Sequence, residues 1–119
     1  MSENRREYFR VIFHQSINGE VAMHGDTHFV PVEIENVSVR GLKFISSMDI
    51  GINNKVTCSF KIMDGSFLLD GSIIRKSRRT HDIEYGVGFD VDQDTSSQLF
   101  KQLNYYQIRQ RKGNPMEMD

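Results

Sequence analysis

The chain has 119 residues, a formal net charge of -1 and a sequence pI near 6.4, with 38% hydrophobic and 26% charged residues. This length suits one domain with a single hydrophobic core, and the composition is that of a globular rather than a disordered protein. The near-neutral charge, the lack of a long apolar segment and a charged start unlike a secretory signal predict a cytoplasmic protein that neither inserts into membranes nor binds nucleic acid.

The first part of the chain predicts a basic arm followed by β-strands. Residues 1–10 are expected to form a flexible arm, and from Val11 onward apolar and polar residues alternate as in half-buried strands. Asn18-Gly19 is expected to make a tight hairpin turn, and Pro31, which lacks a backbone donor, favours an edge or a strand end. Further strands are predicted over residues 28–38, 41–47, 55–62, 67–76 and 83–91, with turns at Gly51 to Asn54 and at Asp64-Gly65.

Cys58 is the only cysteine, so the sequence holds neither an internal disulfide nor a metal site built from several thiolates. It lies in the segment 55–62, where it shares the apolar side of the alternation with Val56 and Phe60. This position predicts a buried structural thiol rather than a reactive one.

The periodicity changes near Thr95 from strand to helix. Leu99, Leu103 and Tyr106 lie at helical spacing and predict a helix over residues 95–111, capped by Asp94 or Thr95, with a disordered tail over 113–119. Antiparallel strands must hide their edges, and closure into a barrel does this economically. We therefore expect an all-β fold with a C-terminal helix: a six-stranded antiparallel β-barrel over residues 11–92, with the helix covering one opening or face.

The sequence shows no enzyme motif. His24 and His28 are four residues apart, but they flank Gly25 in a stretch expected to be a loop, so a solvated turn is favoured over a metal site. The glycines of "YGVGF" lie inside a predicted strand and do not open a helix, so they do not form a nucleotide fingerprint. We expect no catalytic residues, no metal and no cofactor.

Cations gather at the start of the chain. Arg6 and Arg10 form an R-x-x-x-R pair, with Arg5 directly before it. The spacing alone is weak evidence, because Arg75 and Arg79 repeat it elsewhere, and taken by itself it indicates a solvated basic arm.

A second polar motif follows some 30 residues later, at the end of the second predicted strand. "NVSVRG" contains Asn36, Ser38 and Gly41 in the pattern [Asp or Asn]-x-Ser-x-x-Gly, which chance would produce about 0.1 times in this composition. A turn stabilised by the Ser or Asn side chain explains it structurally, and this explanation is compatible with function. Because side chains two apart lie on one face of a strand, Asn36 and Ser38 are expected to converge on one ligand, while Gly41 allows close approach of backbone.

These two motifs, in this order and followed by a terminal helix, resemble the PilZ family of bacterial cyclic diguanylate (c-di-GMP) receptors. The resemblance covers a single domain over residues 1–112 and implies a receptor of the stand-alone type, with a six-stranded barrel that passes the signal to a protein partner. It implies c-di-GMP binding by Arg5, Arg6, Arg10, Asn36, Ser38 and Gly41. A guanidinium suits this ligand because it bonds bidentately to phosphate or to guanine and stacks on the base.

The resemblance also suggests that the residue at Arg5 influences whether one or two c-di-GMP molecules bind, and we expect two. The arm is expected to become ordered on the ligand and so to produce the signal. Motility, polysaccharide production, biofilm formation and virulence all fit such a receptor.

Two alternatives compete with this interpretation. One is a PilZ-like scaffold that acts in pilus assembly or motility through protein contacts without binding nucleotide. The other is a barrel for single-stranded nucleic acid, which would need aromatic platforms on a basic face. The aromatic residues of the strands, such as Phe13, Phe60 and Phe89, are instead expected on the core side.

Overall fold

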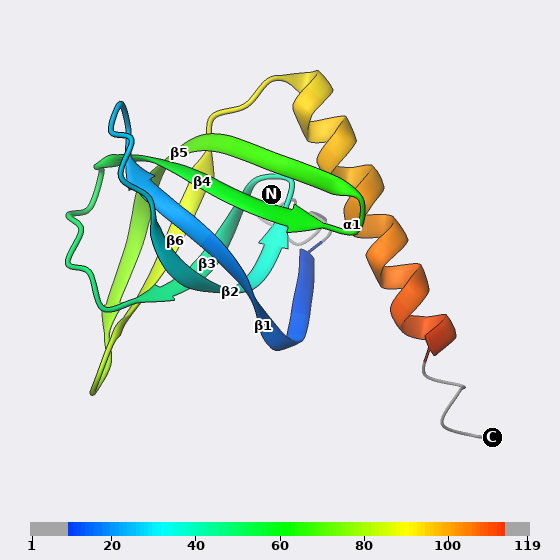
Figure 1. Ribbon diagram of the computed structural model, residues 1–119, viewed down its shortest axis with the longest axis horizontal. Coiled ribbons are helices and arrows are strands. Elements are labelled where there is room, and N and C mark those ends of the chain that lie inside the picture. The colour runs from blue at the N-terminus through cyan, green and yellow to red at the C-terminus, as the bar shows by residue number, and fades with distance from the viewer. Residues whose placement is uncertain (1–9, 114–119) are drawn as a thin grey trace, which may run out of the picture.

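The computed structural model describes residues 10–113, which form one closed barrel and one helix (Figure 1). The strands are β1 (Arg10–Met23), β2 (Val30–Ser38), β3 (Gly41–Ser46), β4 (Lys55–Ile62), β5 (Gly65–Arg78) and β6 (Ile83–Phe89), and the helix is α1 (Gln93–Gly113). Around the barrel the order is β1-β2-β3-β6-β5-β4, and every neighbouring pair is antiparallel. The predicted six-stranded antiparallel barrel with a C-terminal helix is confirmed. The disordered tail was expected over residues 113–119, but Gly113 belongs to the helix, and residues 114–119 lie outside the described residues.

The hairpin turn predicted at Asn18-Gly19 is wrong, because β1 runs through these residues without interruption. Gly19 pairs with Val32 of β2 on one side and with Phe60 of β4 on the other, so both edges of the strand are occupied here. A Cβ atom at Gly19 would lie 2.4 Å from Cδ1 of Ile34. The glycine therefore serves close packing inside a paired strand, and tertiary pairing outweighs the local turn preference.

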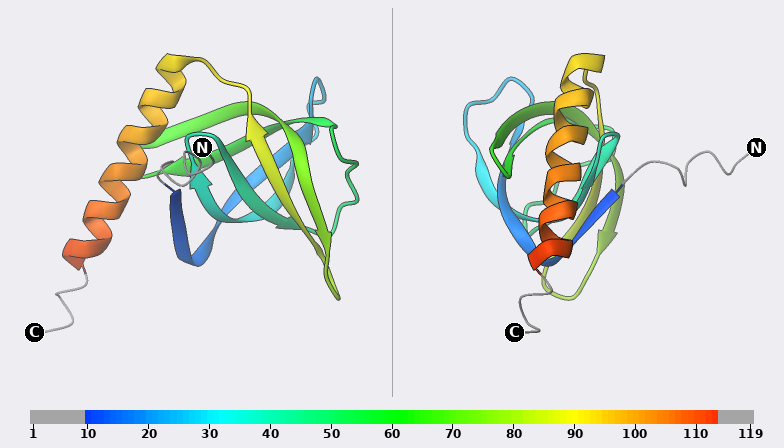
Figure 2. Two further views of the ribbon diagram at one scale, coloured as in Figure 1. Left: turned by 180° about the vertical axis from the view of Figure 1, so that it is seen from behind. Right: turned by 90° about the vertical axis from the view of Figure 1, so that its right-hand side faces the viewer.

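The barrel interior is filled by the alternating apolar side chains of the strands, including Cys58, which is fully buried. Helix α1 lies across one end of the barrel (Figure 2). Leu99 and Leu103 point from the helix into this end and are 0% exposed, so the apolar stripe found in the sequence closes the core.

The helix is two residues longer at each end than predicted, and its cap differs. The backbone N–H of Thr95 donates a hydrogen bond of 2.8 Å to Oδ1 of Asp92, so Asp92 caps the first turn in place of Asp94 or Thr95. The pKa of Asp92 is lowered, mainly by this backbone hydrogen bond. A carboxylate before the helix satisfies a free N–H group and also meets the positive end of the helix dipole.

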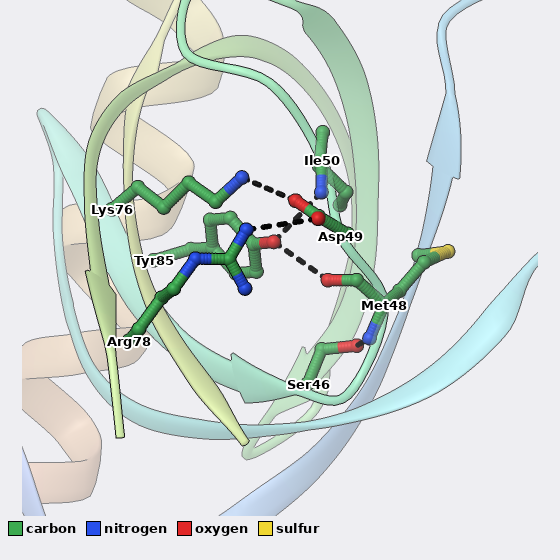
Figure 3. Close-up of polar contacts among 7 residues, drawn as sticks. All are labelled: Ser46, Met48, Asp49, Ile50, Lys76, Arg78 and Tyr85. Atoms are coloured by element: carbon green, nitrogen blue, oxygen red, sulfur yellow. Dashed lines mark hydrogen bonds and ion pairs between the residues drawn. The ribbon is translucent and has the colours of Figure 1, made fainter. Parts of the chain in front are cut away.

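The loop between β3 and β4 lies at the end of the barrel opposite the helix and is held by side chains of β5 and β6 (Figures 1 and 3). The buried hydroxyl of Tyr85 donates to the carbonyl of Met48 at 2.6 Å and accepts the N–H of Ile50 at 2.7 Å. Asp49 in the same loop forms ion pairs with Lys76 and with Arg78, the latter at 2.9 Å. These contacts fix the loop on the barrel.

Candidate ligand-binding site

The two sequence motifs meet on the described part of the barrel at Arg10. Arg10 pairs with Ser38 across β1 and β2, and its guanidinium donates hydrogen bonds to Oδ1 of Asn36 and, at 3.2 Å, to Oγ of Ser38. Asn36 is 8% exposed and Ser38 is 0% exposed. The three residues form a polar corner, which we call the Arg10 corner. Arg10 was expected at the end of the arm, but strand pairing makes it the first residue of β1.

Ser38 has a structural role within this corner. Its hydroxyl donates to the carbonyl of Gly41 at 3.4 Å and accepts the N–H of Arg40 at 3.1 Å, besides accepting from Arg10. A serine hydroxyl offers one donor and two acceptor lone pairs, so all of them are used inside the protein. Ser38 therefore ties the β2–β3 turn and positions Arg10, whereas the amide N–H groups of Asn36 have no partner among residues 10–113 and are available.

Gly41 is required by the packing of β3 on β6. It pairs with Gly88, and a Cβ atom at Gly41 would lie 2.0 Å from the carbonyl oxygen of Val87. The backbone that approaches this glycine closely is thus that of β6. Among the described residues Gly41 therefore serves the packing of the barrel.

A cavity of about 490 Å³ opens beside the Arg10 corner, on the outer face of the barrel. Its lining comes from β1, β2, β3, β5 and β6 and comprises Arg10, Asn36, Leu42, Lys43, Ile74, Arg75, Ser77 and residues 84–87. The lining holds three cationic side chains against one carboxylate, that of Glu84, which lies 3.3 Å from Nζ of Lys43. The cavity is therefore electropositive and suits an anion.

The surroundings of Arg10 disfavour the charged form of its guanidinium. Burial lowers the pKa of the Arg10 guanidinium, and the like charge of Arg75 lowers it further. An anion bound in the cavity would oppose both effects, because it would replace the hydration that Arg10 loses on burial and would screen the repulsion between Arg10 and Arg75.

The other residues considered in the sequence are the predicted site residues Arg5 and Arg6 and the histidine pair for which a solvated turn was expected. Arg5 and Arg6 lie outside the described residues. His24 and His28 lie on the surface, where Nδ1 of His24 is 3.7 Å from the Asp70 carboxylate and the backbone N–H of His28 donates to Asp26.

Among residues 10–113, no three His, Cys, Asp or Glu side chains gather as they would around a metal ion. The same part of the chain has no helix with the length and apolarity that crossing a membrane requires.

Sequence reasoning missed the far wall of the cavity, which Ile74, Arg75 and Ser77 of β5 provide. Arg75 was noted only as part of a repeated R-x-x-x-R spacing. The sequence signal that could have singled it out is the adjacent apolar pair Ile73-Ile74, where strict alternation fails and a bulge can form.

Comparison with known proteins agrees with this architecture. A family model described as PilZ domain matches residues 4–106. The chain belongs to the PilZ domain family. No curated protein matches this PilZ domain closely enough to count as a relative.

Several solved structures share the fold at low sequence identity. The PilZ domain of YcgR from Escherichia coli with c-di-GMP is 15% identical, with a TM-score of 0.72, over 92% of this chain and 96% of the other. The PilZ domain of CeSA from a cellulose-synthesizing bacterium is 18% identical, with a TM-score of 0.62, over 81% and 98%. PlzA of Borreliella burgdorferi in complex with c-di-GMP is 18% identical, with a TM-score of 0.59, over 84% of this chain and 41% of PlzA. At these identities the likeness establishes the fold.

Proposed function

We propose that this PilZ domain is a receptor for c-di-GMP, which binds in the cavity beside the Arg10 corner. The observation that carries the proposal is the position of Arg10, whose guanidinium is held by Asn36 and Ser38 at the rim of an electropositive cavity. Two similar structures, of YcgR and of PlzA, contain c-di-GMP, which supports the choice of ligand.

The chemistry of the corner fits a cyclic dinucleotide with two phosphates and two guanines. The Arg10 fork donates paired hydrogen bonds to phosphate oxygens or to O6 and N7 of guanine, and the Asn36 amide offers further donors. Ser38 and Gly41 contribute by holding the corner in shape. Each bidentate contact is worth roughly 1 to 3 kcal/mol, which corresponds to about one or two orders of magnitude in affinity.

The segment before β1 completes the site in this proposal. Arg6 adds a second guanidinium, and Arg5 stacks on and neutralises a second c-di-GMP molecule, giving two ligands per chain. Residues 4–9, which precede β1, become ordered on the ligand, and the covered surface is what a downstream protein partner recognises. The protein then acts as a cytoplasmic signal receptor without catalytic activity, in a single domain over residues 1–112.

Calorimetric titration with c-di-GMP tests the ligand, the residue and the stoichiometry together. The unaltered chain should bind at micromolar or lower concentration, Arg10→Ala should bind about ten to a hundred times more weakly, and Arg109→Ala, on the exposed helix end, should bind normally. Absence of binding by the unaltered chain would instead favour a protein-interaction scaffold. Amide hydrogen exchange of residues 4–9 should slow on ligand addition, and unchanged exchange would contradict the ordering step.

A further inference from the structure

The far side of the cavity is formed by a bulge in β5. Ile73 pairs with Val87 of β6, whereas Arg75 pairs with the next residue, Gly86, so Ile74 is an extra residue in the strand. Ile73 points into the core and is 0% exposed, while Ile74 is 61% exposed. The bulge places Ile74 and Arg75 together on the outer face, where both line the cavity.

Arg75 lies in one row of paired residues with the Arg10 corner. Asn36 pairs with Lys43, Lys43 with Gly86, and Gly86 with Arg75, so Arg75 and Asn36 are three strand spacings apart, about 14 Å along the sheet. Gly86 has no side chain, and the cavity floor is therefore bare backbone between Lys43 and Arg75. A Cβ atom there would lie 3.2 Å from Cβ of Arg75.

The guanidinium of Arg75 is not used within the described fold. It is exposed and has no hydrogen-bond or ion-pair partner among residues 10–113. Arg79, which repeats the spacing of the N-terminal arginine pair, differs in this respect, because its Nε is 2.7 Å from Oδ1 of Asp82. Arg75 therefore faces Arg10 across the cavity without a counterion among residues 10–113, and its like charge adds to burial in lowering the pKa of Arg10.

We propose that Arg75 is a third ligand-binding arginine, whose guanidinium binds the half of the cyclic dinucleotide farther from Arg10. This proposal rests on the proposed function and assigns the opposite wall of the same cavity. Both the phosphate oxygens and the guanine edge of that half accept the paired N–H groups of a guanidinium, while the side chain of Ile74 gives an apolar surface against which a base can lie.

The test compares Arg75→Gln, Arg75→Lys and Arg109→Gln by calorimetry with c-di-GMP and by thermal unfolding without ligand. Arg75→Gln should lose about tenfold or more in affinity. Arg75→Lys should recover only part of the loss, because an ammonium is a point charge without the fork. Arg109→Gln carries the same change in net charge away from the cavity and should bind normally. The free Arg75→Gln domain should be at least as stable as the unaltered chain, since the substitution removes repulsion.

The binding results separate the role of Arg75 from the proposed function of the domain. If the unaltered chain binds c-di-GMP and Arg75→Gln binds equally well, the role of Arg75 is wrong while the proposed function stands. Full affinity of Arg75→Lys, or an equal loss in Arg109→Gln, would show a general charge effect and overturn the bidentate contact. If the unaltered chain itself does not bind, the proposed function fails first.

Discussion

The rings of Phe13 and Tyr106 meet edge to face, with their centroids 5.2 Å apart and their planes at 83°. This contact joins β1, three residues after Arg10, to helix α1 on the side where Leu99 and Leu103 close the barrel. The helix is thus attached to the same strand that carries Arg10. The helix and the first strand are therefore expected to unfold together.

Tyr106→Ala should lower the free energy of unfolding by about 2 kcal/mol, because both the ring contact and part of the buried apolar area are lost. Urea unfolding followed by circular dichroism measures this. Tyr105→Ala is the matched control, since Tyr105 lies at the preceding position of the helix, is 48% exposed and should contribute little to stability. Equal effects of the two substitutions would show that the contact with Phe13 does not hold the helix.

Gly41→Ala should destabilise the domain severely, by more than about 3 kcal/mol, because its Cβ would collide with the Val87 carbonyl oxygen in the backbone of β6. Gly51→Ala provides the control, because the nearest atom to a Cβ there is 3.6 Å away. Thermal unfolding of the two variants should differ clearly. A stable Gly41→Ala variant that loses only ligand affinity would show instead that this glycine is needed for the ligand and not for packing.

Much of the fold was predictable because the interior of a closed barrel imposes a period of two on every strand. Val11 and Phe13, and later Cys58 and Phe60, are buried as their alternation predicts. The turn predicted at Asn18-Gly19 is wrong because pairing with β2 and β4 outweighs the local turn preference of these two residues. The local sequence contains no information about that pairing, since the partner residues lie elsewhere in the chain.

The sequence predicts the part of the site that lies on one face of a single strand, β2. Asn36 and Ser38 share a face by simple alternation, and they do meet Arg10, although pairing β1 with β2 was needed to show how. Arg75 could not be placed, because alternation from the buried Ile73 puts it on the inner side. Only the bulge against β6 turns Arg75 outward, and a bulge depends on pairing with the neighbouring strand.

The ion pairs of Asp49 should make part of the stability depend on pH in acid. Hydrogen bonds from Lys76 and then Arg78 hold the pKa of Asp49 below its ordinary value of 3.8 (Figure 3). Because the folded pKa is lower than the unfolded one, the contribution is complete above the unfolded pKa and is lost as pH falls through the folded value. The stability difference between the unaltered chain and Asp49→Asn should therefore be fully present near pH 7, begin to shrink as the pH falls to about 4, and disappear only below the lowered pKa of Asp49.

Asp64→Asn is the control for this titration, because Asp64 is exposed and its side chain has no ion-pair partner in the described part of the chain. Urea unfolding at several pH values should show no pH-dependent gap for this variant. A gap for Asp49→Asn that persists unchanged into acid would contradict the ion-pair explanation.

Cys58 should resist thiol reagents as long as the barrel is folded. Burial raises the pKa of its thiol to about 12, with the charge of Asp70 as a smaller cause, so the reactive thiolate is scarce as well as inaccessible at neutral pH. Labelling with a disulfide reagent near pH 8 should be at least about a hundredfold slower than for an exposed cysteine, and urea should abolish the difference. The exposed cysteine of the variant Cys58→Ala with Ser66→Cys supplies the comparison within the same fold. Fast labelling of native Cys58 would show that β4 opens readily, which its pairing with both β1 and β5 argues against.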